Sequence, residues 1–139
     1  MELDESDCID RLGHAGHGVL ATVHPTRGVD VVPVVFALDG RRIVIPVDTI
    51  KQKRSTDLQR SKNLRADPRC ALLVEHYSDD WSELWWVRIH ATGSDCPSGS
   101  LDAVRRLLAS RHPQYSAEGS VVAALVLDPE AISGWAAST

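Results

Sequence analysis

The sequence lacks most of the features that announce a function. Its 139 residues include only three lysines, one phenylalanine and three cysteines, and no two cysteines form a C-x-x-C pair. Such sparse cysteines are typical of free thiols in a reducing compartment. No apolar run approaches the roughly 20 residues that span a bilayer, and the acidic start MELDESD is unlike a signal peptide. We therefore expect a cytoplasmic protein without a membrane span.

Several motifs that carry chemistry are also missing. The sequence has no G-x-x-x-x-G-K-[ST], no G-x-G-x-x-G and no G-x-S-x-G, which excludes the common nucleotide loops and the hydrolase elbow. His14 and His17 are three residues apart but lack two further ligands at a usual spacing, so we predict no metal site. The net charge of −4 and the pI of 5.8 argue against a general nucleic-acid binder.

A basic stretch on this acidic chain is the strongest local feature. It contains all three lysines, Lys51, Lys53 and Lys62, and between positions 51 and 65 six basic residues stand against one acid. The local charge of +5 leaves −9 for the rest of the chain. Two interpretations stay open: side chains that hold an anion, first of all a phosphate, or a solvated loop without a ligand.

Apolar periodicity and turn signals predict a mainly β fold of one domain, residues 1–139. We expect about six antiparallel strands, closed into a small barrel, with two or three short helices outside. The predicted strands cover residues 19–23, 29–38, 41–47, 69–77, 84–92 and 121–127, with a last extended piece over 132–136. The predicted helices cover residues 4–13, 59–66 and 101–111.

Three details of these elements are specific predictions. The run 29–38 is almost continuously apolar, which predicts a strand buried on both faces. Pro33 within it marks a bulge, an edge, or a close approach to the backbone. Asp39-Gly40 predicts a hairpin, and Ser100 is the expected N-cap of the helix that follows it.

The strand over 84–92 has two different faces. Alternation places Trp85, Val87, Ile89 and Ala91 on an apolar face and Trp86, Arg88 and His90 on the other. An indole beside a cation, away from the core, suits a flat anionic ligand or a second subunit. Packing in a core or an interface is the alternative for the tryptophans.

Taken in order, these segments resemble the pyridoxamine 5′-phosphate oxidase-like split β-barrel family. The segments KNLRADPRCALLV and WWVR are its more specific parts, and the likeness runs from about Gly18 to Gly134-Trp135. Within the family, the chain most resembles the actinobacterial branch that uses the deazaflavin coenzyme F420. The resemblance implies an FMN-binding split barrel that forms a homodimer, with two cofactors in grooves between the subunits.

The resemblance also implies a set of phosphate ligands. In the family, basic residues after the third strand bind the phosphate of the flavin or deazaflavin. Here those residues would be Lys51, Lys53 and Lys62, with Thr49 and Ser55 as hydroxyl donors. The family's Ser-Arg-Lys triplet reads Arg-Ser-Lys in this chain, so the resemblance does not say which cations contact the phosphate.

The ring of the cofactor would lie against strand backbone, and the second subunit would close the groove. Trp86 and Arg88 are the side chains expected at that closure. The strand residues that would contact the cofactor are Val32, Pro33, Val34 and Val47.

The function implied is hydride transfer from reduced F420 to a small acceptor such as an enone or a quinone. The excess positive charge favours F420, which carries an oligoglutamate tail, over FMN. No residue is assigned as catalytic, although His90 and Tyr77 are candidates for protonating a product. An FMN-dependent oxidoreductase, a carrier of F420 or FMN without catalysis, and a haem-binding split barrel remain alternatives.

Overall fold

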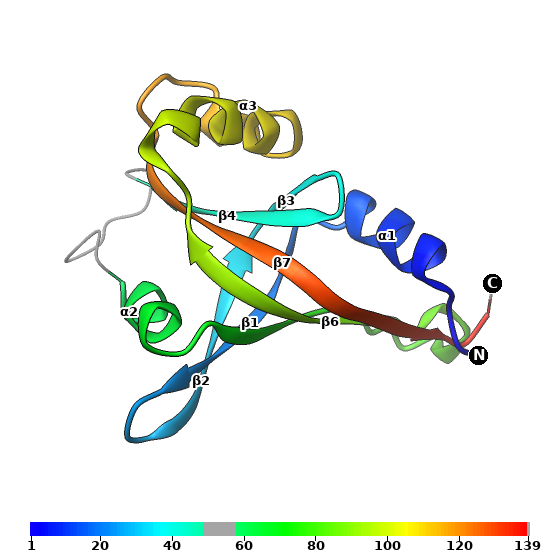
Figure 1. Cartoon of the computed structure of the whole chain (residues 1–139). Helices are drawn as coiled ribbons and strands as arrows, with labels where there is room; N and C mark the ends of the chain where they lie inside the picture. Colours follow the sequence, from blue (N-terminus) through cyan, green and yellow to red (C-terminus); the bar gives the residue numbers. More distant parts are fainter. Residues whose placement is uncertain (49–57, 139) are drawn as a thin grey trace.

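The computed structural model describes residues 1–48 and 58–138, and there the chain forms one antiparallel sheet. The strand order is β2-β1-β5-β6-β7-β4-β3, so the prediction of about six strands is one short. Figure 1 shows α3 over one side of this sheet, with α1 and α2 far apart. The strands are β1 (His17–His24), β2 (Gly28–Val35), β3 (Ala37–Asp39), β4 (Arg42–Asp48), β5 (Arg69–His76), β6 (Trp85–Asp95) and β7 (Val121–Ala136).

The helices begin and end close to the predicted residues. α2 (Gln59–Ala66) and α3 (Leu101–Arg111) have the predicted bounds, and α1 (Glu5–His14) begins one residue later than expected. Ser100 occupies the N-cap position of α3 as predicted, but its side chain makes no cap hydrogen bond and its backbone is helical, continuing a preceding 3-10 turn. Short 3-10 turns complete the described elements: η1 (Trp81–Glu83), η2 (Ser98–Ser100) and η3 (Pro113–Tyr115).

The run 29–38 is not one strand buried on both faces. It forms β2 and β3, separated at Phe36, whose backbone N–H donates to the carbonyl of Gly16 at 3.1 Å. Within residues 1–48 and 58–138, β2 pairs with β1 alone at one edge of the sheet, which explains the tolerance for Pro33. Val29 and Val31 are 64% and 66% exposed. A continuous apolar run cannot distinguish a buried strand from an edge strand with an apolar outer side.

The two predicted C-terminal pieces are one strand of 16 residues, β7. Pro129 lies within it and pairs with Ala91, next to a register shift at His90/Ala91 in β6. The shift lets the ladder pass a residue that has no N–H to donate. β6 also continues through Asp95, three residues beyond the predicted end of the strand at residue 92.

The buried side chains form two clusters on opposite faces of β4 and β7. Ile43 and Leu125 belong to the interior cluster enclosed by the sheet. Val44 and Val126 belong to a second cluster, where Leu108 of α3 packs on the outside. Both faces of β4 and β7 are therefore covered, and alternate residues along these strands are buried in different clusters.

Gly18 provides a test of how tightly β1 and β5 pack. A Cβ added at Gly18 would lie 2.7 Å from the carbonyl oxygen of Leu73, which is backbone and cannot rotate away. We expect Gly18→Ala to lower the free energy of unfolding by about 1–3 kcal/mol, as overpacking does. Urea denaturation measures this, with Gly99→Ala as the control because nothing lies within 4 Å of its added Cβ. Equal stability of the two variants would contradict the close packing of these strands.

Candidate functional site

The outward surface of β2, β1, β5 and β6 is left open by the helices of the described chain. Along β1 and β5, Leu20 and Leu72 are fully buried, whereas the alternate residues Val19 and Leu73 are 40% and 41% exposed. Exposed apolar side chains that are contiguous mark interaction sites more often than single ones do. We call this surface the outer face. It comprises Val19, Ala21, Val23, Val29, Val31, Pro33, Ala71, Leu73, Glu75, Trp86, Arg88 and His90.

Strand register brings three of the predicted site residues onto this face. Pro33 pairs with Val19, Val19 with Leu73, and Leu73 with Arg88, in one row across four strands. At about 4.8 Å between strands, Pro33 and Arg88 lie roughly 14 Å apart. The guanidinium carbon of Arg88 lies 5.2 Å from the ring centroid of Trp86, so the predicted indole and cation are in contact.

The other predicted strand residues point elsewhere. Val32 is half-buried and pairs with Leu20, while Val34 and Val47 are 4% and 1% exposed and pack inside the protein. These positions can offer backbone groups to a ligand, but Val34 and Val47 do not present side chains to it. Val47 lies near the end of β4, just before residues 49–57.

Lys62 is the one predicted phosphate ligand whose place can be described. It is exposed on α2, which contains the C-terminal part of the basic stretch. The remaining predicted ligands lie outside the described residues: Thr49, Lys51, Lys53 and Ser55.

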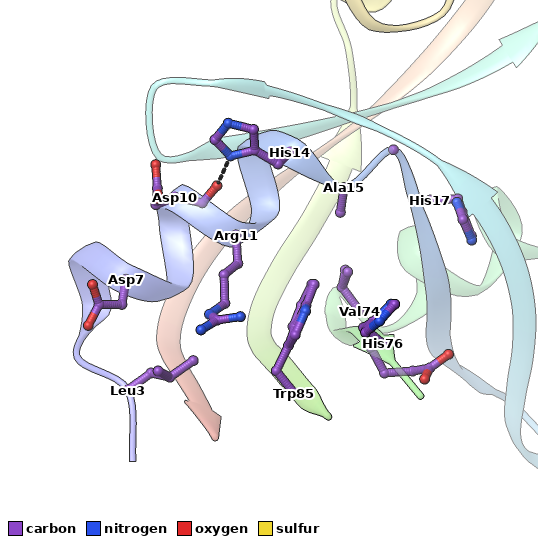
Figure 2. A pocket seen from close by; sticks show the side chains of 12 residues that line it. Leu3, Asp7, Asp10, Arg11, His14, Ala15, His17, Val74, His76 and Trp85 are labelled. Atoms are coloured by element: carbon purple, nitrogen blue, oxygen red, sulfur yellow. Dashed lines mark hydrogen bonds between the residues drawn. The ribbon is translucent and has the colours of Figure 1, made fainter. Parts of the chain in front are cut away.

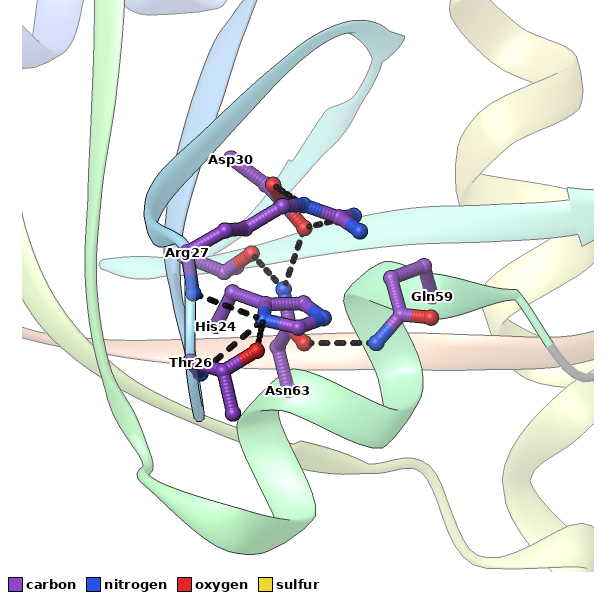
Figure 3. A network of polar contacts seen from close by, with 7 residues as sticks. His24, Thr26, Arg27, Asp30, Gln59 and Asn63 are labelled. Carbon is purple, nitrogen blue, oxygen red and sulfur yellow. Dashed lines mark hydrogen bonds and ion pairs between the residues drawn. The ribbon is translucent and has the colours of Figure 1, made fainter.

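A buried amide fixes α2 to the hairpin of β1 and β2 (Figure 3). Asn63 is fully buried, and its Nδ2 donates to Thr22 Oγ1 at 3.0 Å and to Asp30 Oδ2 at 2.9 Å. Gln59 Nε2 donates to Asn63 Oδ1 at 2.9 Å. The Asn63 side chain is thus satisfied by three partners, which is what a buried polar group requires. This contact sets the position of α2, the helix that carries Lys62.

Asp30 is the charged member of this network. Arg27 donates to both of its carboxylate oxygens at 2.8 Å, and Asn63 adds a further donor. These hydrogen bonds favour the ionised form and lower the pKa of Asp30 to about 2. The backbone N–H groups of Thr26 and Arg27 donate to His24 Nδ1, which fixes the turn of the hairpin.

Asn63 lies in the segment KNLRADPRCALLV, but the sequence pattern predicted no role for it. A signal was present, because asparagine disfavours a helix interior unless its side chain has a specific partner. Thr22 and Asp30 could not be joined to it from the sequence, since they lie 41 and 33 residues away.

The described residues offer little for metal or thiol chemistry. No group of three or more His, Cys, Asp or Glu side chains among them is arranged to hold a metal ion. Burial raises the pKa of the Cys70 thiol to about 11, so it is no nucleophile near neutral pH. No helix within the same residues is long and apolar enough to cross a membrane.

Comparison with known proteins gives the family. The family described as pyridoxamine 5′-phosphate oxidase matches residues 9–136. The chain belongs to this family. The match confirms both the resemblance at the family level and the predicted split-barrel fold, which is mainly β with helices outside. No match was found among curated proteins.

Solved structures with the same fold have various descriptions. A conserved hypothetical protein of Mycobacterium tuberculosis is 19% identical, with a TM-score of 0.78 over 97% of this chain and 86% of the other. A FAD-binding protein of Mesorhizobium loti is 17% identical, with a TM-score of 0.71 over 96% and 95%. The haem storage protein HutZ of Vibrio cholerae is 14% identical, with a TM-score of 0.67 over 95% and 93%. At these identities the likeness shows the fold alone.

The network around Asp30 predicts a pH dependence of stability. Because the folded state lowers the pKa of Asp30 from about 4 to about 2, its contribution is present above pH 4 and is lost as the pH falls towards 2. We expect Asp30→Asn to be less stable than wild type at pH 7 and the difference to shrink at pH 2.5. Urea denaturation at both values measures this.

Asp79→Asn is the control for that experiment. Asp79 is exposed in the turn that precedes η1, so its replacement should change stability little at either pH. A difference between wild type and Asp30→Asn that stays the same at pH 7 and pH 2.5 would contradict the assigned hydrogen bonds.

Proposed function

We propose that the protein is a homodimeric, F420-dependent oxidoreductase acting on small organic molecules. The observation that carries this proposal is the outer face, an apolar strand surface that bears the stacked pair Trp86 and Arg88. Folding of a single chain leaves this surface in water, which is unfavourable unless a ligand or another subunit covers it. A flat ring bound between two copies of the chain would cover it from both sides.

The preference for F420 rests on charge. Residues 51–65 carry +5 on a chain of −4, which is more than the single phosphate of FMN needs. The oligoglutamate tail of F420 is a polyanion, and two or three charge-assisted contacts of about 1.5–3 kcal/mol each would anchor it. Lys62 is exposed on a helix that Asn63 holds in place, so its ammonium group starts from a fixed backbone.

Residues of β2 and β6 would form the surface against which the cofactor ring lies. β2 is an edge strand paired with β1 alone within the described chain, so its outer edge has backbone N–H and C=O groups free to bond a ring. Pro33 has no N–H, which leaves a carbonyl-rich and rigid stretch at that point. The Trp86 indole and the Arg88 guanidinium present a flat cationic surface to an anionic ring from the partner side.

The chemistry that a bound, reduced deazaflavin supplies is donation of a hydride to an enone or a quinone. The protein's part is to orient the acceptor and exclude water from the covered face. His90 is the better placed proton donor, because it lies on the outer face, whereas Tyr77 is 74% exposed beyond the end of β5. All three cysteines are free thiols, in keeping with the cytoplasmic location we propose.

FMN, FAD and haem are the competing ligands. The names of two structural relatives mention FAD binding and haem storage, and FAD shares with F420 a tail that is longer than that of FMN. A carrier that binds F420 without turnover is the non-enzymatic alternative. These candidates are separated by direct titration.

Titration of the purified protein with F420, FMN, FAD and haem, followed by tryptophan fluorescence, tests the cofactor. We expect F420 to bind most tightly and the variant Lys51→Ala/Lys53→Ala to bind it at least about tenfold more weakly, a cost of about 1.4 kcal/mol. The reason is the loss of two cations from the tail site. Arg106→Ala is the control, because Arg106 is paired with Asp102 on α3.

Three outcomes would change the proposal. Preferential binding of FMN, FAD or haem would replace F420 as the cofactor. F420 that binds but transfers no hydride to enones and quinones would identify a carrier. An unchanged F420 affinity in the double-lysine variant would move the anionic tail away from the basic segment.

A single charge on the outer face tests the homodimer. Leu73→Asp places a carboxylate at the centre of the face, so we expect a monomer by light scattering at micromolar concentration, where wild type is a dimer. Val122→Asp is the matched control, because Val122 is similarly exposed, at 39% against 41% for Leu73, and lies on β7 outside the outer face. A wild-type monomer, or a Leu73→Asp dimer, would contradict the shared groove.

A further inference from the structure

A second concave site lies between α1 and the ends of β1, β5 and β6 (Figure 2). It is a cleft of about 560 Å³. Leu3, Val74 and Trp85 form its apolar floor, and each is buried or half-buried. Acidic side chains stand at the rim, where they are exposed: Asp7, Asp10 and Glu75.

Arg11 is the unusual group in this cleft. Its guanidinium carbon lies 5.3 Å from the ring centroid of Trp85, and the residue is half-buried. Among the described residues it has no hydrogen-bond acceptor and no carboxylate within 4.0 Å. Arg27 and Arg69, by contrast, each hold a carboxylate with two nitrogens. The guanidinium N–H groups of Arg11 are therefore not bonded to any group of the described chain.

A carboxylate on the same helix, that of Asp7, could pair with Arg11 but does not. Asp7 lies four residues earlier, the spacing at which helical ion pairs form. Instead the guanidinium turns inwards and stacks on Trp85, whose ring also has His76 at 6.3 Å and nearly parallel to it. Figure 2 shows Arg11 and His76 on either side of the Trp85 indole. This stacking fixes the plane of the guanidinium inside the cleft.

We propose that this cleft binds a small monocarboxylate with an apolar body. The planar fork of Arg11 matches the two oxygens of a carboxylate, and Leu3 and Val74 provide apolar surface for the body of the ligand. The exposed acids at the rim select for low charge, because a phosphate or a larger polyanion would meet three carboxylates around one guanidinium.

The cleft is far from the proposed tail site on α2, although it adjoins the outer face, because Trp86 follows Trp85 along β6 and pairs with Glu75 at the rim. β6 runs from Trp85 in the cleft to Gly93, where Leu64 of α2 lies within 3.0 Å of an added Cβ. Eight residues of strand at about 3.3 Å each put these ends roughly 26 Å apart. Figure 1 likewise shows α1 and α2 well separated. The inference goes beyond the proposed oxidoreductase and does not depend on it.

Nuclear magnetic resonance with two probes, phenylacetate and inorganic phosphate, tests the site. We expect phenylacetate to shift the Trp85 indole N–H and the Arg11 Nε–H resonances saturably, and phosphate to leave them in place. Trp85→Phe assigns the indole signal among the four tryptophans.

Arg11→Gln should bind phenylacetate at least about tenfold more weakly, and Arg106→Gln, a control on α3, should bind it like wild type. Arg11→Lys keeps the charge and the stem but loses the fork, so it should also weaken binding and guards against a folding defect in Arg11→Gln. Absence of a saturable shift, equal affinity in both Arg11 variants and wild type, or equal binding of phosphate would overturn the proposal.

Discussion

A curled antiparallel sheet has two surfaces, and apolar side chains on both of them need to be covered. Here α3 covers only part of the outward surface. β4 and the part of β7 that pairs with it at residues 124–127 are buried on both faces, with Ile43 and Leu125 inside and Val44 and Val126 beneath α3. The strands β2, β1, β5 and β6 have the same interior but no helix of the described chain over their outer side. The outer face follows directly from this unequal cover. Everything proposed about the cofactor and the second subunit depends on it, because an apolar surface in water is stabilised by whatever covers it.

The position of α2 depends on one buried amide. Asn63 joins Thr22 and Asp30 of the β1–β2 hairpin to α2, the helix that carries Lys62. A buried amide is stabilising only when its donors and acceptor are all satisfied, so this contact defines one register of helix against hairpin. The contact thereby joins the Arg27–Asp30 ion pair of the hairpin to the helix that carries Lys62. Arg11 shows the opposite arrangement, a half-buried cation that has no carboxylate partner among the described residues.

Local signals were sufficient for most elements. The bounds of α2 and α3 follow from Asp67-Pro68, His112-Pro113 and a helical apolar stripe, which act within a few residues. Alternation also divided β6 correctly, with Val87 and Ile89 fully buried and Arg88 and His90 exposed. Prediction failed where a strand's environment depends on distant chain: β2 is as apolar as a buried strand, and β7 passes through Pro129 only because β6 shifts register opposite it.

The sequence by itself determined the family, the mainly β fold, the basic segment and the pairing of Trp86 with Arg88 on one strand face. The family follows from a resemblance in local motifs, and the other features follow from composition and period-2 alternation, which need no knowledge of the rest of the chain. Only the tertiary structure decided that Val34 and Val47 point into the protein, that Pro33 shares a row with Arg88, and that Asn63 meets Asp30. It alone set Arg11 against Trp85, 74 residues away in the sequence. The physical reason is that the order of the strands, and the faces that the helices cover, depend on the apolar surface buried by the whole chain. No single segment determines that total.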